Sequence, residues 1–167
     1  VYMNENKILD LPNGLHKGYT YNIFRMETTG DANPLISNFR IAGGLSDMRN
    51  KLITEGKLIS YGIQFDVNSD KVKPESYATI KEIAQVLKDN PTVKIKVVGH
   101  TDSDGEDAKN LDLSKRRAVS VKNELTAKFS IDASRIETDG KGETETIANN
   151  DSQMNKAKNT RVELIKL

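Results

Sequence analysis

From residue 59 onward, hydrophobic positions recur with spacings that alternate between those of strands and those of helices. The run 59–65 predicts a strand. Pro74-Glu75 then favours a helix start, because proline lacks only an N–H that would be unpaired there. Asn90-Pro91 ends this helix, and alternation over 93–97 predicts the next strand. The stripe expected to be buried on the helix has helical spacing and consists of Tyr77, Ile80, Ile83, Ala84 and Leu87.

A second helix is predicted to begin at Ser114, because serine is a common N-cap residue. Two further strands are expected over 135–141 and 161–166. The predicted order is β-α-β-α-β-β, which is an α+β fold with two helices packed on one face of a mixed sheet. The hydrophobic positions of the second helix follow helical spacing and are Ala118, Val121, Leu125 and Phe129.

The beginning of the chain has a different pattern, with short alternating runs separated by turn-forming residues. We expect a hairpin within 1–10 and strands over 19–26 and 35–42. A segment with this small number of strand residues cannot bury a core by itself. We therefore interpret this β-rich segment as the tail of a larger, truncated β-sandwich. An extension that packs on the main domain is the alternative. The expected limits are 1–44 for this segment, 45–58 for a connector and 59–167 for the main domain.

Composition excludes several classes of function. The 167 residues carry 25 Lys and Arg against 24 Asp and Glu, a formal net charge of +1. The chain therefore lacks the basic excess that general nucleic-acid binding requires. No hydrophobic run approaches the ~20 residues of a membrane-spanning helix, so we expect membrane association only through other parts of a longer parent protein. There is no cysteine, which excludes disulfides and thiolate zinc sites.

One motif has the beginning of a calcium-binding loop and lacks the rest. Asp66, Asn68 and Asp70 have the spacing that opens an EF-hand loop. The positions for its glycine and its bidentate glutamate hold Lys71 and Tyr77 instead. We interpret these acidic and amide side chains as turn-forming residues, and we expect neither a metal ion nor another cofactor.

Another motif places potential catalytic groups side by side. His100 is followed by Thr101, Asp102 and Ser103. Neighbours on a strand point to opposite faces of the sheet, so these residues are poorly arranged for a catalytic triad. We therefore expect His100 to be structural and the protein not to be an enzyme.

The basic run 115–117 would lie in the first turn of the second helix if Ser114 capped it. The positive end of a helix disfavours cations, so such an arrangement suggests that an anion is bound there. Asp102 ends the preceding strand, and Asp102 and Arg117 can therefore face each other across a loop-lined pocket. A carboxylate and a guanidinium so placed suit a zwitterionic ligand. A plain Asp102–Arg117 salt bridge explains the residues equally well.

At these positions the sequence resembles the OmpA-like (OmpA/MotB C-terminal) peptidoglycan-binding domain family. The resemblance covers about residues 57–167, with several linked motifs in the order and spacing of the family. These motifs are Phe65-Asp-Val-Asn68, Gly99-His-Thr-Asp-Ser-x-Gly105, Asn110-x-x-Leu113-Ser114-x-x-Arg117-Ala118, Gly140-Lys-Gly-Glu143 and Asn159-Thr-Arg161-Val162-Glu163.

The resemblance implies non-covalent binding of peptidoglycan through the meso-diaminopimelate of its stem peptide. By analogy, Asp102 would accept the ammonium of that residue and Arg117 would bind its carboxylate. Asn68, Thr101 and Asn110 match positions that would add hydrogen bonds. The resemblance also implies a protein at the periplasmic face of the outer membrane that is anchored to the cell wall, and it leaves a homodimer open.

One position departs from the family pattern. The family usually has Asn-Arg-Arg-Val where this chain has Asn159-Thr160-Arg161-Val162. The first of those arginines normally adds positive charge at the rim of the pocket. We therefore expect Thr160 to change the affinity or the preference among stem peptides. The alternative function is a structural or protein-interaction domain on the same fold that does not bind the wall.

Overall fold

The computed structural model describes residues 2–3, 6–7 and 48–167 of the chain. β1 (Tyr2–Met3) and β2 (Asn6–Lys7) pair in antiparallel fashion, which confirms the hairpin predicted within the first ten residues. The strands predicted over 19–26 and 35–42 lie outside the described residues.

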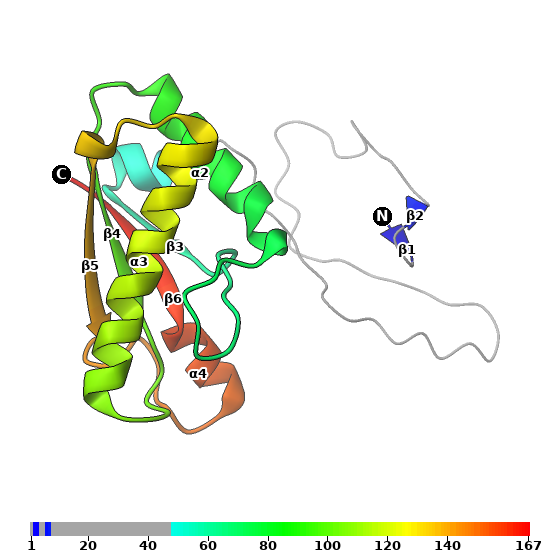
Figure 1. The fold of residues 1–167 in the computed structure, drawn as a ribbon, viewed down its shortest axis with the longest axis vertical. Coiled ribbons are helices and arrows are strands. Elements are labelled where there is room, and N and C mark those ends of the chain that lie inside the picture. The colour runs from blue at the N-terminus through cyan, green and yellow to red at the C-terminus, as the bar shows by residue number, and fades with distance from the viewer. Residues whose placement is uncertain (1, 4–5, 8–47) are drawn as a thin grey trace. The chain divides into compact units, whose positions relative to one another are not determined.

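Four strands of the main domain form one mixed sheet in the order β3-β6-β4-β5. They are β3 (Lys57–Ser60), β4 (Ile95–His100), β5 (Ile136–Gly142) and β6 (Arg161–Lys166). β4 and β5 are parallel, whereas β6 is antiparallel to both β3 and β4. The predicted α+β fold with a mixed sheet is therefore confirmed, and the last strand of the chain lies inside the sheet (Figure 1).

Two long helices contribute their hydrophobic sides to the core. α2 (Tyr77–Asp89) follows a 3-10 turn at Pro74–Ser76, and α3 (Asp107–Phe129) packs along β4 and β5 (Figure 1). Most of the predicted stripe of α2 is buried, but Tyr77 is 48% exposed and packs its ring against Phe129. The buried core includes Ile80, Ile83, Ala84, Leu87, Ala118, Val121 and Leu125 from the helices and Leu58, Ile95, Val97, Ile136, Val162 and Leu164 from the strands.

Shorter helical segments complete the domain. α4 (Gln153–Asn159), which the sequence pattern did not predict, lies between β5 and β6. Single turns occupy Asn50–Thr54 and Ala133–Arg135. Within the part of the chain that the structure describes, no helix is long and apolar enough to span a membrane.

Residues ahead of position 59 also belong to this core. The strand predicted over 59–65 is instead β3, which begins at Lys57 and ends at Ser60, and Phe65 then forms an isolated bridge with Val72. Leu52 and Leu58, in the segment expected to be a connector, are both buried in the core.

The prediction that Ser114 caps α3 is wrong. α3 begins at Asp107, so Ser114 lies inside the helix and is fully buried. Its hydroxyl donates to the Leu111 carbonyl (2.8 Å) and accepts from the Gly142 N–H (2.9 Å). A serine inside a helix can bond back to a carbonyl in this way. The basic run 115–117 is consequently remote from the positive end of the helix, and the helix dipole gives no reason to expect an anion there.

Ser114 instead marks the place where α3 lies closest to the sheet. A Cβ atom at Gly99 of β4 would collide with the Ser114 carbonyl, and one at Gly140 of β5 would collide with the Lys115 N–H. Glycine at both positions therefore allows the helix backbone to approach the strands. This contact fixes Arg117, one turn further along α3, relative to the end of β4.

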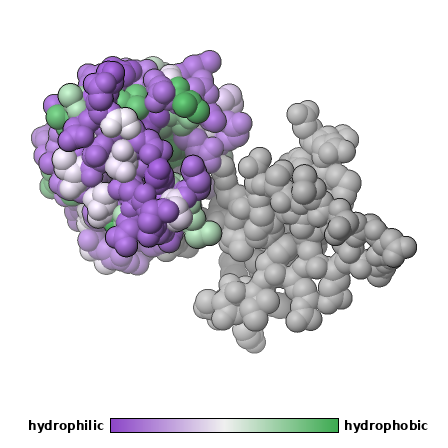
Figure 2. All heavy atoms as spheres, turned by 90° about the horizontal axis from the view of Figure 1, so that it is seen from below, coloured by the Kyte–Doolittle hydropathy of each residue, from purple (hydrophilic) through white to green (hydrophobic). Residues whose placement is uncertain are grey.

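The surface of the domain is mainly polar. On the face shown in Figure 2, hydrophilic residues predominate and hydrophobic residues occur in small groups. Scattered exposed hydrophobic side chains are normal for folded domains. This face therefore offers no broad apolar surface.

Candidate functional site

A groove with a volume of about 370 Å³ opens at the end of β4, where the chain after β3 meets α3 and α4. Ligand sites commonly combine apolar walls with a few polar groups, and this groove has that character. Its lining consists of Tyr61, Ile63, Gln64, Phe65, Lys73, His100, Arg117, Ala157, Thr160 and Arg161. Of the predicted site residues, Arg117 lines it directly.

Arg117 is held by backbone carbonyls and an aromatic ring. It is 8% exposed. Its Nε donates to the Ser69 carbonyl (3.0 Å) and its Nη2 to the Asp66 carbonyl (3.5 Å). Its guanidinium carbon lies 4.9 Å from the centre of the Phe65 ring, a cation–π contact. The loop that opens like a calcium site therefore orients an arginine through its carbonyl groups.

The buried guanidinium of Arg117 has no carboxylate partner within ion-pair distance among the described residues. Burial lowers its pKa, and the nearby charge of Asp102 acts in the opposite direction. A buried charge without a counterion is unfavourable. The groove thus presents a desolvated cation that an anionic ligand group would stabilise.

Arg116, the neighbouring arginine, has a different environment. It lies at the surface and pairs with Asp70 (3.2 Å) and Asp112 (2.8 Å). Within the basic run 115–117, the groove is therefore lined by Arg117 alone.

Asp102 stands beside the groove and is oriented by two hydrogen bonds. Its Oδ2 accepts from the Thr160 hydroxyl (2.7 Å), and its Oδ1 accepts from the Asp104 N–H (3.0 Å). No ion pair joins Asp102 to Arg117 in the described part of the chain, so the plain salt bridge considered above is not formed. The two opposite charges are close enough to influence each other and are not in contact.

Asn68 and Asn110 line a second hollow, of about 670 Å³, together with Asp104 and Gly105 of the loop that follows β4. Asn110 is buried and donates to the carbonyls of Asp102 (3.3 Å) and Asp104 (3.2 Å), and also to Glu143. Its amide is thus committed to holding this loop. The structure does not bring Asn68 and Asn110 into the groove that contains Arg117.

Thr101 is also buried, and its hydroxyl has no hydrogen-bond partner in the structure. Its backbone N–H donates to the Gly142 carbonyl (2.9 Å) and so continues the pairing of β4 with β5. A role of Thr101 in ligand binding stays a prediction.

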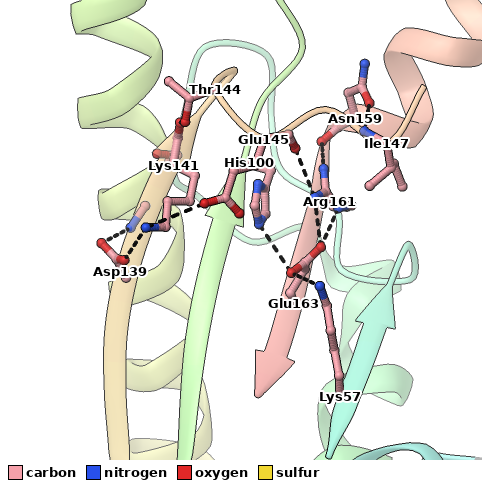
Figure 3. A network of polar contacts seen from close by, with 12 residues as sticks. Lys57, His100, Asp139, Lys141, Thr144, Glu145, Ile147, Asn159, Arg161 and Glu163 are labelled. Atoms are coloured by element: carbon pink, nitrogen blue, oxygen red, sulfur yellow. Dashed lines mark hydrogen bonds and ion pairs between the residues drawn. The ribbon is translucent and has the colours of Figure 1, made fainter. Parts of the chain in front are cut away.

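Behind the groove lies a buried charge network (Figure 3). Glu163 of β6 accepts from Arg161 (2.8 Å) and pairs with Lys57 of β3 (2.7 Å). His100 of β4 points its Nε2 at Glu163 from 3.6 Å, and neither ring nitrogen has a hydrogen-bond partner among the residues that the structure describes. No group of three or more potential metal-ligating side chains in the described residues could hold a metal ion.

Two contacts of the site are not predicted by the sequence. The sequence pattern predicts an effect of Thr160 on affinity, but not its hydrogen bond to Asp102, which lies 58 positions away in the chain. Phe65 was part of a motif, with no role assigned to its ring. No local sequence signal links either side chain to Asp102 or Arg117, because both contacts depend on the tertiary fold.

The chain is similar to known proteins in sequence and in fold. A model of the OmpA family matches residues 64–160. Outer membrane porin F of Pseudomonas aeruginosa is 38% identical over 111 residues, which are 66% of this chain and 32% of the porin. The chain therefore spans less than half the length of that relative.

Solved structures show the same fold. The periplasmic domain of Helicobacter pylori MotB is 28% identical with a TM-score of 0.57, covering 66% of this chain and 79% of that one. The cell wall anchor of the T6SS from Pseudomonas aeruginosa is 25% identical with a TM-score of 0.56, covering 70% of this chain and 91% of that one.

Proposed function

Because the chain belongs to the OmpA family, we propose that its domain binds peptidoglycan non-covalently, through the meso-diaminopimelate of the stem peptide. In this proposal the domain lies in the cell envelope, at the periplasmic face of the outer membrane, and anchors its parent protein to the wall. The names of an outer membrane porin and a cell wall anchor among the similar proteins support that location.

The observation that carries the proposal is the buried guanidinium of Arg117, which has no carboxylate within ion-pair distance in the described part of the chain. A ligand carboxylate could accept two hydrogen bonds from it and supply the missing negative charge. Asp102, oriented and without an ion pair among the described residues, would accept the ammonium at the same end of the ligand. A zwitterionic ligand would thus neutralise both groups, which a simple anion or cation would not.

Binding without bond cleavage agrees with the chemistry of the groove. The imidazole that lines it, His100, is 1% exposed, and no hydroxyl or carboxylate of the described residues is hydrogen-bonded to it. Nucleophilic catalysis needs a base within hydrogen-bond reach of the nucleophile. We therefore propose recognition of the stem peptide with no turnover.

The adjacent arginines provide a matched test. We expect Arg117→Gln to weaken binding of a diaminopimelate-containing stem peptide about 30-fold or more, because an unpaired charge in a partly buried site costs about 2–5 kcal/mol. Arg116→Gln, which removes the same charge at the preceding position, should change the affinity less than about threefold, because exposed ion pairs contribute little. Calorimetric titration of the folded variants measures both affinities.

A second comparison tests the ligand. A stem peptide with lysine in place of diaminopimelate lacks the terminal carboxylate, so it should bind wild-type protein as weakly as Arg117→Gln binds the complete ligand. Equal binding of both peptides would contradict the assignment of Arg117. A folded wild-type domain that binds neither peptide nor purified sacculi would instead favour a structural or protein-interaction domain.

A further inference from the structure

Thr160 contacts Asp102 at two points. Its hydroxyl donates to Oδ2 of Asp102 (2.7 Å) and accepts from the Asp102 backbone N–H (3.3 Å). Thr160 follows α4 and immediately precedes β6, and it also lines the groove. One side chain therefore holds both the backbone and the carboxylate of Asp102 at the groove wall.

The negative charge of Asp102 is left uncompensated by this arrangement. Among the described residues, no cation pairs with Asp102. The nearby Lys156 of α4 pairs with Asp104 instead (2.6 Å). A hydroxyl satisfies one carboxylate lone pair without cancelling the charge, and the Asp104 N–H does the same at the other oxygen.

We propose that Thr160 is a positioning residue that orients the Asp102 carboxylate and leaves its charge available for the ammonium of the ligand. The inference rests on the proposed function and extends it. It assigns the preference for an amine-bearing ligand to the contact between Thr160, which joins α4 to β6, and Asp102 in the loop after β4. In this arrangement Thr160 need not touch the ligand. Its effect on affinity passes through Asp102.

Four variants of the full chain separate this role from a merely structural one. Thr160→Val keeps the shape and removes the hydroxyl, and we expect it to weaken binding of the diaminopimelate stem peptide about tenfold, as for loss of a hydrogen bond to a charged group. Thr160→Ser retains the hydroxyl and should bind within about twofold of wild type. In an Asp102→Asn background, Thr160→Val should cause no further loss. NMR titration reaches the weak affinities that this comparison requires.

The ligand supplies an independent control. With the side-chain amine of the peptide acetylated, Thr160→Val and wild type should bind equally weakly, because no ammonium remains for Asp102 to accept. Undiminished binding of the intact peptide by Thr160→Val would overturn the inference. So would an equal further loss in the Asp102→Asn background, which would indicate a general change in the groove.

Failure of the proposed function has a different signature. If wild-type protein binds no stem peptide, the proposed function and this inference both fall. If wild type binds and only the predicted differences among the Thr160 variants are missing, the inference alone falls. Thermal unfolding of each variant verifies the fold, and Thr160→Ala compared with Thr160→Ser provides the same test should Thr160→Val fail to fold.

Discussion

At the scale of single residues, the most buried charges of the domain surround Glu163. This carboxylate is 2% exposed and is shared between Arg161 and Lys57, with His100 on the neighbouring strand (Figure 3). Burial raises the pKa of Glu163, but the hydrogen bonds from Lys57 and Arg161 outweigh it, and the pKa lies below its usual value of 4.5. The charged form of Glu163 therefore stabilises the folded state.

We expect Glu163→Gln to lower the free energy of unfolding at pH 7 by about 3–5 kcal/mol, because it leaves Arg161 buried without its counterion. The folded pKa of Glu163 is below the unfolded one, so its stabilisation is present above pH 4.5 and is lost as the pH falls through the folded pKa. The difference between variant and wild type should thus shrink in acid. Urea unfolding at pH 7 and at pH 3.5 measures it, and an unchanged difference would contradict the assignment.

His100 adds a second pH dependence in a separate range. Burial, followed by the charge of Arg161, lowers its pKa below 6.5, so protonation favours the unfolded chain as the pH falls below that value. Wild-type stability should therefore decline between pH 7 and pH 5.5, by at most about 1.4 kcal/mol per pH unit. His100→Phe should flatten this decline and cost little at pH 7, because the ring nitrogens make no hydrogen bonds. Parallel declines in both proteins would show that His100 is not responsible.

At the scale of elements, hydrophobic spacing predicted the buried stretches of the helices, but it did not predict the polar start of α3 or the polar helix α4. The stripe from Ala118 to Phe129 is buried as expected. The first turns of α3 are largely exposed and polar, so they carry no periodic signal, and the pattern therefore predicts a start at Ser114 instead of Asp107. α4 likewise has no apolar stripe, and Asn159 fixes its end by bonding Ile147, Ala148 and Asn150.

In the candidate site, too, the sequence predicted some residues and not the partners that hold them. Motifs along the chain identified Asp102 and Arg117, because their spacing in sequence is characteristic. The carbonyls that hold Arg117 and the hydroxyl that holds Asp102 come from distant segments. Such partners are brought together only by the tertiary fold. Every residue type has a backbone carbonyl, so the sequence cannot indicate which carbonyls will hold Arg117.

The close approach of α3 to the sheet can be tested at one position. Gly99→Ala places a methyl group against the Ser114 carbonyl, and backbone atoms on both sides cannot yield as a flexible side chain could. We expect a loss of about 1–3 kcal/mol in the free energy of unfolding. Ala108→Ser, an equally small change at an exposed position in the first turn of α3, is the control and should leave the free energy of unfolding nearly unchanged. Unaltered stability of Gly99→Ala in urea unfolding would show that the helix can move away.

At the scale of the whole molecule, the core of the described residues extends ahead of the family match. The compact unit that contains the groove runs from Ile41 to Leu167. Leu52 and Leu58 are buried in its core, and the Gly56 carbonyl accepts from the Lys166 N–H (2.9 Å). We therefore propose that the domain begins before position 57, although the resemblance by motifs begins there.

Two fragments distinguish these limits. We expect fragment 41–167 to fold cooperatively by itself and to retain the proposed binding to sacculi, because it contains both the core and the groove. Fragment 59–167 loses Leu52 and Leu58, and with each buried leucine contributing about 1.5–3 kcal/mol, it should be less stable by at least about 3 kcal/mol. It also loses Lys57 and thereby one of the two cations on Glu163.

Thermal and urea unfolding of the two fragments measure this difference directly. Equal stability would place the start of the domain at residue 59 and make the preceding segment a true connector. Lower stability of 59–167, restored in 41–167, would establish that residues before β3 belong to the folding unit. Because Glu163 loses Lys57 but keeps Arg161, the shorter fragment should also lose part of the acid-dependent stability that Glu163 contributes. This loss would link the segment before β3 to the charge network behind the proposed binding site.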